Sequence, residues 1–284
     1  MSIGATMNPS RTAVPVILYH ANCDDGFGAA YAAWESLGNE ADYRAVHHGD
    51  TVTVDDFARR DIYILDFSYE PTILRAIAAV AKSVTLLDHH KSAAAQWQDS
   101  PIPANATIVF DMARSGAQMA WDFFHPGRPR PQLIEYIGDR DLWQFALPDS
   151  REFSAGLQLV PIDFSAWQHI DVASTIESGR TILAYQRRQV KSSLNKPLRE
   201  VTIGGHRGLA INAIANTSEL GHALALKSGT FGMTFFVKDD EVVCSLRSLA
   251  PFDVSEIAKS FGGGGHAQAA GFRLTVVRFF GEIW

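Results

Sequence analysis

Three apolar runs in the N-terminal part of the chain are each followed directly by carboxylate or imidazole side chains. In chain order these side chains are His20, Asp25, Asp66, Asp88, His89 and His90. Crowded carboxylates repel one another unless cations neutralise them, and mixed carboxylate and imidazole donors suit Mn²⁺, with Mg²⁺ or Co²⁺ as alternatives. Two such ions can activate water and stabilise both oxygens of a phosphoryl displacement. The side chains therefore predict a two-metal centre that hydrolyses phosphoester or phosphoanhydride bonds.

Each of these residues also has an ordinary interpretation when it is taken alone. An aspartate after a strand, such as Asp66, is usually a helix cap or a turn residue, and a single histidine such as His89 usually lies in a loop. The coincidence of three such strand ends favours metal binding over three separate structural roles.

The segments that must position these side chains alternate between strand-like and helix-like patterns. They read "VPVILYH", "GFGAAYAAWESLG", "DIYILDFS", "PTILRAIAAVAKS" and "VTLLDHH", with "ATIVF" as a further strand. This alternation predicts an α/β fold with a parallel sheet and helices on both faces. Because ligands bind beyond the carboxyl ends of such strands, we expect the three strand ends to meet at one edge.

A further acidic contribution is expected from "YIGDRDLWQF". The pattern predicts a helix that breaks into a loop at Gly138, with Asp139 and Asp141 flanking Arg140 at the helix end. A helix C-terminus disfavours anions, so either a metal ion or Arg140 must stabilise these carboxylates. Both aspartates are therefore candidate metal ligands.

The stretch "FGGGGHAQAAGF", residues 261–272, predicts an anion-binding loop. Four consecutive glycines favour positive φ or a close approach of main-chain N–H groups to a ligand, and "HAQAA" can form a helix whose N-terminus would attract an anion. The alternative is a flexible loop. Upstream, Arg247 ends a predicted strand in "VVCSLRSLA", where it could bind phosphate through two donors or be a surface arginine.

Composition limits the class of protein. The chain has 284 residues, 46% of them hydrophobic, which is enough for two domains. A net charge of −6 argues against a protein that coats long nucleic acid, although it permits a small phosphorylated substrate. Two cysteines, with no signal peptide and no membrane span in the sequence, predict a cytoplasmic protein.

The pattern changes along the chain suggest boundaries. We predict a disordered tail at residues 1–13, the α/β domain at 14–163 and a helical connector at 164–198. A smaller α+β domain is predicted at residues 199–284, where strand-rich segments replace the earlier alternation.

Several motifs together resemble a known family. The order "HANCDDGFGAA", "ILDFS", "LLDHHKS", "GDRDLW", "SLRS" and "GGGGHAQAAGF" resembles the DHH phosphoesterase family joined to its DHH-associated C-terminal domain, in the oligoribonuclease and exopolyphosphatase-like branch. The match runs from Val16 to about Phe272. It implies a parallel-sheet catalytic domain with two Mn²⁺ ions and a smaller substrate-binding domain across a cleft.

The resemblance also implies roles for individual residues. Asp66 would bridge both metal ions, His90 would face the substrate phosphate, and Asp88 would either bind metal or orient the histidine pair. The implied metal ligands are His20, Asp25, Asp66, Asp88, His89, and one or both of Asp139 and Asp141. The residues implied in catalysis are Asp88, His90 and Arg247. The residues implied in gripping the phosphate and the terminal nucleotide are Arg247, Gly264, Gly265 and His266.

One position departs from the family pattern. The first motif of the family has two aspartates separated by one residue before a glycine, whereas this chain has Cys23 at the first of those positions and Asp25 at the second. Either Cys23 is a soft ligand, or Asp24 or His20 takes its place.

Three functions are compatible with these residues. The first is a Mn²⁺-dependent phosphohydrolase for short nucleotides such as oligoribonucleotides, linear dinucleotides or a nucleoside bisphosphate. The second is an exopolyphosphatase-like enzyme that cleaves phosphoanhydrides. The third is a nucleotide-binding protein whose altered first motif has lost catalysis. In each case we expect a small phosphorylated ligand, no long double-stranded nucleic acid and no membrane, and homodimer formation is left open.

Overall fold

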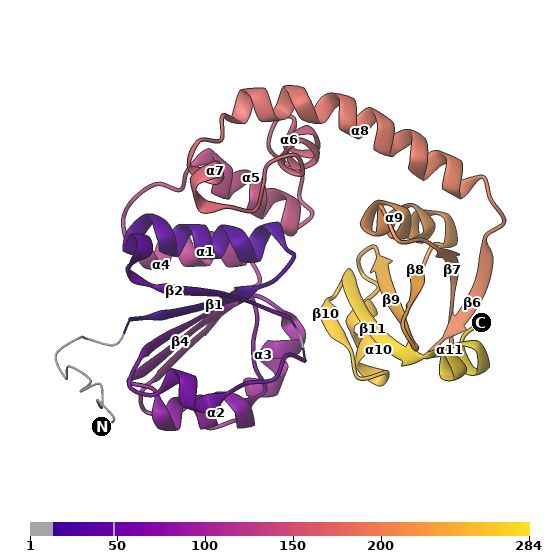
Figure 1. Ribbon diagram of the computed structural model, residues 1–284. Helices are drawn as coiled ribbons and strands as arrows, with labels where there is room; N and C mark the ends of the chain where they lie inside the picture. The colour runs from indigo at the N-terminus through magenta and orange to yellow at the C-terminus, as the bar shows by residue number, and fades with distance from the viewer. Residues whose placement is uncertain (1–13, 48) are drawn as a thin grey trace, which may run out of the picture. The chain divides into compact units, whose positions relative to one another are not determined.

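The computed structural model describes residues 14–47 and 49–284, so the predicted tail at residues 1–13 lies outside the described residues. The chain divides into two compact units (Figure 1). The first comprises the chain up to His89 together with Ser100–Leu142, and the second comprises His90–Asp99 and Trp143–Trp284. The boundaries predicted at 14–163, 164–198 and 199–284 stay a prediction.

The first unit is built on a parallel sheet of five strands in the order β2-β1-β3-β4-β5. Its strands are β1 (Val16–His20), β2 (Asp42–Val46), β3 (Asp61–Leu65), β4 (Ser83–Asp88) and β5 (Ala106–Phe110). The central strands are apolar on both faces, as in Ile17 and Ile64, which are fully buried. The connections from β1 and β3 run to opposite sides of the sheet (Figure 1), and open sheets of this kind bind ligands at the carboxyl ends of such strands.

Helices cover both faces of this sheet, which confirms the predicted α/β class. They are α1 (Asp24–Leu37), α2 (Pro71–Val80), α4 (Gly116–Phe124) and α5 (Gln132–Asp141), with short 3₁₀ turns at Gly38–Glu40 and Val54–Phe57. Helices α1 and α4 lie on one face and α2 on the other (Figure 1). Gly28 lets α1 approach α4 closely, because a Cβ there would lie 2.9 Å from the Cβ of Ala117.

The predicted break at Gly138 is wrong, because α5 continues through it to Asp141. A glycine inside a helix normally lowers its stability, but here the missing side chain has a packing reason. A Cβ on Gly138 would lie 2.5 Å from the side chain of Gln118 on α4. The glycine therefore serves helix packing rather than helix termination.

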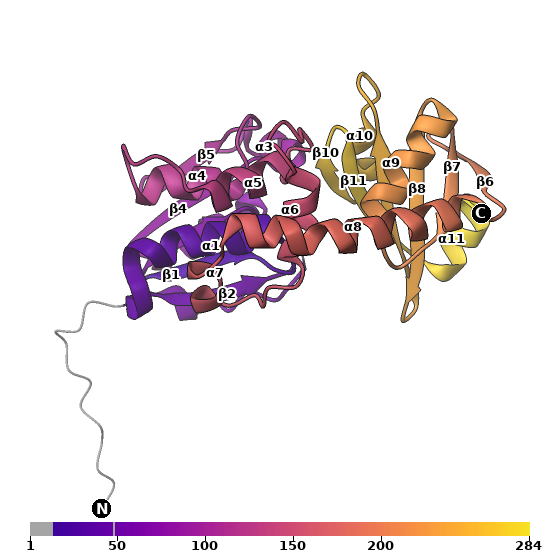
Figure 2. The same cartoon turned by 90° about the horizontal axis from the view of Figure 1, so that it is seen from above.

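The second unit contains a mixed sheet of six strands in the order β10-β11-β9-β8-β7-β6. The strands are β6 (Arg199–Ile203), β7 (His206–Asn212), β8 (Phe231–Lys238), β9 (Glu241–Ser248), β10 (Gly264–His266) and β11 (Ala269–Thr275). Strands β7 and β8 are parallel, and α9 (Thr217–Ser228) connects them and lies against the sheet (Figures 1 and 2). This arrangement confirms the α+β class predicted for the C-terminal part.

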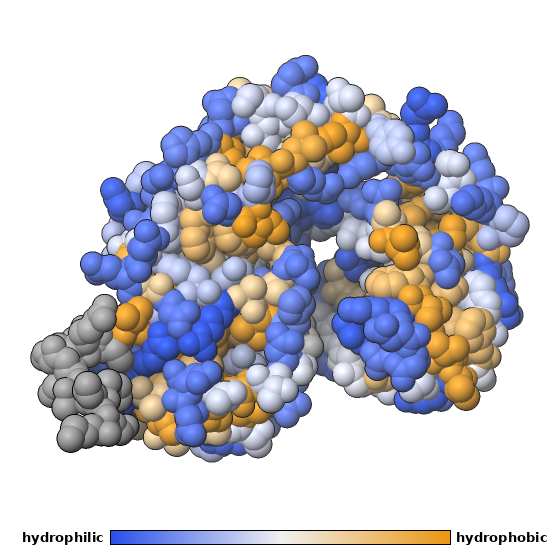
Figure 3. Space-filling view, in the orientation of Figure 1, coloured by the Kyte–Doolittle hydropathy of each residue, from blue (hydrophilic) through white to orange (hydrophobic). Residues whose placement is uncertain are grey.

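Further helices complete the second unit. They are α3 (Lys91–Trp97), α6 (Ser150–Leu157), α7 (Phe164–Gln168), α8 (Val172–Leu194), α10 (Val254–Ser260) and α11 (Val276–Glu282). Glycines let α6 and α8 pack closely, because a Cβ on Gly179 would collide with the carbonyl oxygen of Glu152. Figure 3 shows hydrophilic and hydrophobic side chains interspersed along α8. No helix in the described part of the chain is both long and apolar enough to cross a membrane.

The helix predicted after the glycine run is wrong, because this segment forms a β-hairpin. Strands β10 and β11 pair antiparallel, with Gly264 opposite Gly271 and His266 opposite Ala269. Strand β11 also pairs with β9 along its whole length. These pairings and the burial of Ala270 outweigh the helical preference of an alanine-rich segment.

Candidate metal centre

The carboxyl ends of three neighbouring strands bring polar side chains to one edge of the first unit's sheet. His20 ends β1, Asp66 follows β3, and His89 follows β4. Asp25 lies in the first turn of α1, and Asp141 is the last residue of α5. Residues that are far apart in the sequence therefore meet at the edge where a parallel sheet binds ligands.

Asp66 lies between the two histidines. Its Oδ1 is 3.0 Å from Nε2 of His89, and its Oδ2 is 3.5 Å from Nδ1 of His20. The same Nε2 of His89 is 3.5 Å from an oxygen of Asp25 and 3.5 Å from an oxygen of Asp141. One carboxylate thus contacts donors on both of its sides, which is the arrangement that a carboxylate shared by two ions requires.

Two groups of possible donor atoms consist of first-unit residues alone, and in each of them all atoms lie within 4.8 Å of one another. The first group is His20, Cys23 and Asp66. The second group is Asp25, His89 and Asp141. The first group offers one nitrogen, one sulfur and one oxygen, whereas the second offers one nitrogen and two oxygens.

Burial shifts the pKa values in this cluster. Asp25, Asp66 and His89 are each 1% exposed. Burial raises the pKa of Asp25 well above its ordinary value, and the charges of Asp66 and Asp141 raise it further. Burial lowers the pKa of His89, but its hydrogen bond to Asp66 and the neighbouring carboxylates outweigh this and raise it to about 10. These shifts show that the buried carboxylates lack compensating positive charge, and divalent cations fit this donor set.

The thiol of Cys23 responds to the same surroundings. Its pKa is raised well above the ordinary value by burial and then by the charges of Asp66, Asp141 and Asp25. The sulfur lies close to the carboxylate of Asp66 and also experiences the charges of Asp25 and Asp141.

Asp66 has an unusual backbone conformation. Its φ of 63° lies in the left-handed region, which costs energy for a residue other than glycine. Its N–H donates to the carbonyl of Leu87 on β4 at 2.9 Å, which holds the turn after β3 against the neighbouring strand. Gly116 leaves room for this turn, because a Cβ there would lie 2.5 Å from the Cβ of Asp66.

Asp25 is held by the N-terminus of α4, a contact that the sequence did not reveal. Its two carboxylate oxygens accept hydrogen bonds from the backbone N–H groups of Gly116 at 2.6 Å and Ala117 at 3.0 Å. The helix begins with a capping box formed by Ser115 and Gln118. That capping pattern, directly after the strand "ATIVF", was the available signal for a helix N-terminus at this edge.

Asp88 is buried behind the cluster with both oxygens engaged. One oxygen accepts from the hydroxyl of Ser68 at 2.6 Å, and the other accepts from the backbone N–H of His89 at 2.7 Å. These hydrogen bonds suit a residue that orients the histidine, but an oxygen of Asp88 also lies within 4.8 Å of an oxygen of Asp66, so both roles stay predictions.

The two aspartates at the end of α5 have different positions. Asp141 contributes an oxygen to the second donor group. Asp139 is buried within α5, and neither it nor Asp24 belongs to a donor group found among residues 14–47 and 49–284. Residues two apart on a helix point in nearly opposite directions, so a single helix brings only one of this pair to the cluster.

The predicted substrate-binding residues lie in the second unit. Arg247 on β9 donates to Oγ of Ser218 at 2.7 Å and to its neighbouring backbone carbonyl at 2.8 Å. Gly264 and Gly265 lie on β10, and the N–H of Gly265 donates to Oγ of Ser92 at 3.1 Å.

The two remaining histidines of this set lie together. His90 stacks on His266, with the ring centroids 4.6 Å apart and the planes 20° from parallel. Within the second unit, His90 therefore lies beside the glycine-rich hairpin.

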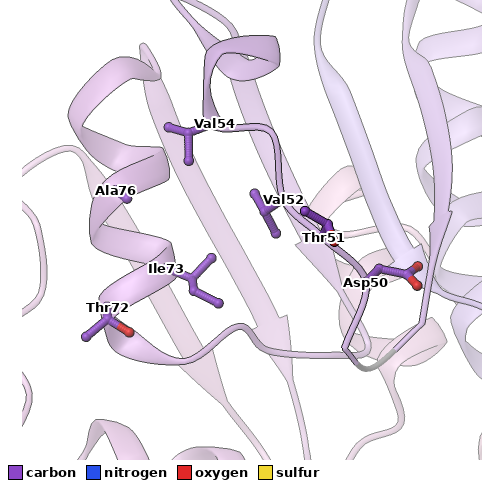
Figure 4. Close-up of a pocket in the computed structure, with 7 residues that line it drawn as sticks. All are labelled: Asp50, Thr51, Val52, Val54, Thr72, Ile73 and Ala76. Atoms are coloured by element: carbon purple, nitrogen blue, oxygen red, sulfur yellow. The ribbon is translucent and has the colours of Figure 1, made fainter.

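A separate pocket of about 390 Å³ lies in the first unit between the segment after β2 and helix α2 (Figure 4). Its lining residues are Asp50, Thr51, Val52, Val54, Thr72, Ile73 and Ala76. The side chains of Val52, Val54 and Ile73 point toward the same space (Figure 4). The pocket shares no residue with the metal-donor groups, and its mostly aliphatic lining does not suit a metal ion.

Known proteins are similar to this chain in sequence. Residues 209–283 match the DHHA1 domain. The chain is 31% identical over 297 residues to the uncharacterized protein R106 of Acanthamoeba polyphaga mimivirus, covering 95% of this chain and 69% of that protein. It is 24% identical over 296 residues to oligoribonuclease NrnB of Bacillus subtilis (strain 168), covering 91% of this chain and 72% of that protein.

The fold is also similar to a solved structure. RecJ of Thermus thermophilus, crystallised in complex with Mn²⁺, matches with a TM-score of 0.52 and 16% sequence identity. The match covers 94% of this chain and 50% of RecJ. At this level of identity, the match supports the fold.

Proposed function

Because the chain belongs to the DHH family of phosphoesterases, we propose that it is a metal-dependent phosphohydrolase that acts on short nucleotides. The hydrolytic class follows from the family. One observation supports metal dependence above all others, namely that the buried carboxylate of Asp66 lies between His20 and His89 with one oxygen directed at each. The similarity to an oligoribonuclease supports short nucleotides as the substrate class.

We propose that two divalent cations bind at the two donor groups, with Asp66 shared between them. Mn²⁺ is the preferred ion, and Mg²⁺ or Co²⁺ could replace it, because oxygen and imidazole donors suit all three. The proposed ligands are His20, Asp25, Asp66, His89 and Asp141, and the buried Asp88 and Asp139 stay further candidates. Bound ions would act as Lewis acids on the phosphoryl oxygens and on water.

The chain's own residues would keep this site fixed during the reaction. Asp88 accepts a hydrogen bond from the N–H of His89 and so holds the backbone that carries the imidazole. Asp25 is fixed by two backbone N–H groups at the start of α4. Ligands held in this way need little rearrangement as charge develops in the transition state.

The second unit would supply the substrate grip. Ser218 and a backbone carbonyl hold the guanidinium of Arg247, a planar donor that matches the oxygens of a phosphate. Gly264, Gly265 and His266 would present backbone N–H groups and an imidazole to the same ligand, and His90 would contact the phosphate. The net charge of −6 favours short substrates, since long strands require a basic track. A cytoplasmic location and a homodimer stay predictions.

A hydrolysis panel tests this function. The purified protein is assayed with Mn²⁺, and with EDTA, against the linear dinucleotide pApA, 3′-phosphoadenosine 5′-phosphate, inorganic polyphosphate and a chromogenic phosphodiester. We expect Mn²⁺-dependent hydrolysis of one of the two nucleotides. The control is the double variant Asp66→Ala with His89→Ala, which removes a donor from each group.

The outcomes separate the alternatives. Hydrolysis no faster than in the double variant, together with retained nucleotide binding, would overturn the enzymatic function in favour of a binding protein. A preference for polyphosphate would overturn the nucleotide substrate class. Full activity in EDTA would overturn metal dependence.

A further inference from the structure

The turn between β1 and α1 holds a cysteine whose position capping does not explain. Cys23 is the N-cap residue of α1, where its side chain makes no regular capping hydrogen bond, although the backbone N–H of Gly26 lies near enough to its sulfur to oppose the rise in the pKa of the thiol. Cysteine is also a poor choice at this position, where serine, threonine, aspartate and asparagine stabilise a helix. A role at the helix start alone therefore does not explain why this residue is a cysteine.

The turn fixes the sulfur beside two other donors. Asn22 adopts a positive φ of 54°, which reverses the chain directly after β1. Gly26 packs directly against the backbone of His20, so that a Cβ there would collide with the carbonyl of His20. The result is that the sulfur of Cys23, a ring nitrogen of His20 and an oxygen of Asp66 lie within 4.8 Å of one another.

The other cysteine of the chain shows what an ordinary structural cysteine looks like here. Cys244 lies on β9 in the hydrophobic core of the second unit, 1% exposed, among apolar side chains such as Phe235 and Phe272. It has the burial and neighbours of a small hydrophobic residue. Cys23 differs because it faces carboxylates and an imidazole.

The geometry points to Cys23 as a thiolate ligand of one metal ion, which makes the two metal positions chemically unequal. This inference rests on the proposed metal centre and specifies it further. Sulfur is a soft donor, so the position formed by His20, Cys23 and Asp66 would select a softer ion such as Zn²⁺, Co²⁺ or Fe²⁺. The position formed by Asp25, His89 and Asp141 has only oxygen and nitrogen donors and would accept Mn²⁺ or Mg²⁺. On binding, the thiol would release its proton to solvent.

Cobalt substitution tests this inference with a spectroscopic signal that is independent of activity. The metal-free full chain, kept reduced, is titrated with Co²⁺ while absorbance and bound cobalt are measured. We expect two bound ions and a near-ultraviolet thiolate-to-cobalt charge-transfer band that reaches its maximum with one of them. The variant Cys23→Ser should lose the band and one ion, whereas the matched control Cys244→Ser should keep both.

The results distinguish this inference from the proposed function. Two bound ions without a charge-transfer band, or a band that survives in Cys23→Ser, would overturn the role of Cys23 and leave the metal centre standing. Wild-type protein that binds no cobalt would overturn the metal centre itself.

A second variant keeps the test decisive if serine disturbs the turn. Cys23→Asp converts the first position to oxygen and nitrogen donors, and circular dichroism reports whether the fold is retained. Its ratio of bound Zn²⁺ to bound Mn²⁺, measured after equilibration with equal amounts of both, should fall by about tenfold or more. An unchanged ratio would overturn the inference.

Discussion

Three candidate ligands of the first unit, Asp25, Asp66 and His89, are almost completely buried, whereas the candidate substrate-binding residues of the second unit are half-buried. Asp66 and His89 are each 1% exposed, but Arg247, Gly265 and His266 all keep partial access to solvent. In the first unit the balance of charge therefore governs the site, because buried carboxylates are costly without cations. In the second unit the backbone conformation shapes the candidate site. Gly265 has a φ of 136°, a conformation that favours glycine.

The largest expected effect comes from Asp66, which belongs to the first donor group and contacts His89 of the second. The change Asp66→Asn should reduce hydrolysis by roughly a thousandfold, because metal ions supply several kcal/mol of transition-state stabilisation and each 1.4 kcal/mol is a factor of ten. Bound metal, measured by elemental analysis, should fall, while nucleotide binding through the second unit should persist. A variant that keeps both ions and its activity would contradict the proposed role of Asp66 in the metal centre.

A smaller effect of a different kind is expected in the second unit. The change Arg247→Ala should raise KM by about 10- to 100-fold, since a charge-assisted hydrogen bond contributes about 1.5–3 kcal/mol. Metal content should not change, because Arg247 lies outside the donor groups. Arg273→Ala is the matched control, an exposed arginine on β11 that pairs with Glu241. Loss of metal in the Arg247 variant would show that the two groups of residues are not separate in function.

The pH dependence of stability should also differ between the units. In the metal-free protein the pKa of His89 is raised to about 10, so its contribution to stability is complete below about pH 6.5 and is lost as the pH rises through about 10. The pKa of Asp25 is also raised, so its contribution to stability is likewise lost as the pH rises. This loss begins above the ordinary pKa of a carboxyl group. Urea unfolding in EDTA should show a free energy that falls across this window, and His89→Gln should flatten it.

In the second unit, His222 should give stability the opposite dependence on pH. Burial lowers the pKa of His222, and the charge of Arg151 lowers it further. Its contribution is present above the unfolded pKa and is lost as the pH falls through the lower folded value. His222→Gln should therefore flatten the acid side of the profile and leave the alkaline side unchanged. A variant that changed the alkaline side would contradict this assignment.

The smallest expected effect lies at the helix that holds Asp25. The change Ser115→Ala removes the cap of α4 and should lower the free energy of unfolding by about 1 kcal/mol. It should also weaken metal binding slightly, because the N–H groups of Gly116 and Ala117 hold Asp25. Asp171→Ala removes the cap of α8 in the second unit and is the control. It should cost similar stability without affecting metal affinity, as measured by calorimetric titration.

The strand ends were predictable from the sequence because apolar runs and the residues after them are local features. His20, Asp66 and His89 could be assigned to one edge once the sheet was known to be parallel. The contact between Asp25 and the start of α4 could not, since it depends on how closely α1 and α4 pack across a long stretch of chain. Close packing at Gly28 belongs to tertiary structure and has no local signature.

The errors have the same origin. Gly138 was taken as a helix end, but a glycine also permits close packing, and here it makes room for Gln118. The segment "HAQAA" prefers a helix locally, yet strand pairing with β9 decides its conformation. Asp139 and Asp141 both qualified as ligands by residue type, and the sequence alone could not show that the rotation of α5 brings Asp141 into the donor group of Asp25 and His89.

The donors of the first unit span the chain from His20 to Asp141, and this spread bears on how the site forms. An ion that needs donors from both ends of this stretch can bind only after β1, β3, β4 and α5 are in place, which are contacts of high sequence separation. Such contacts are absent from an early folding transition state. A bound ion should therefore slow unfolding rather than accelerate folding. During synthesis, the sheet would form first and the ions would enter a nearly finished structure.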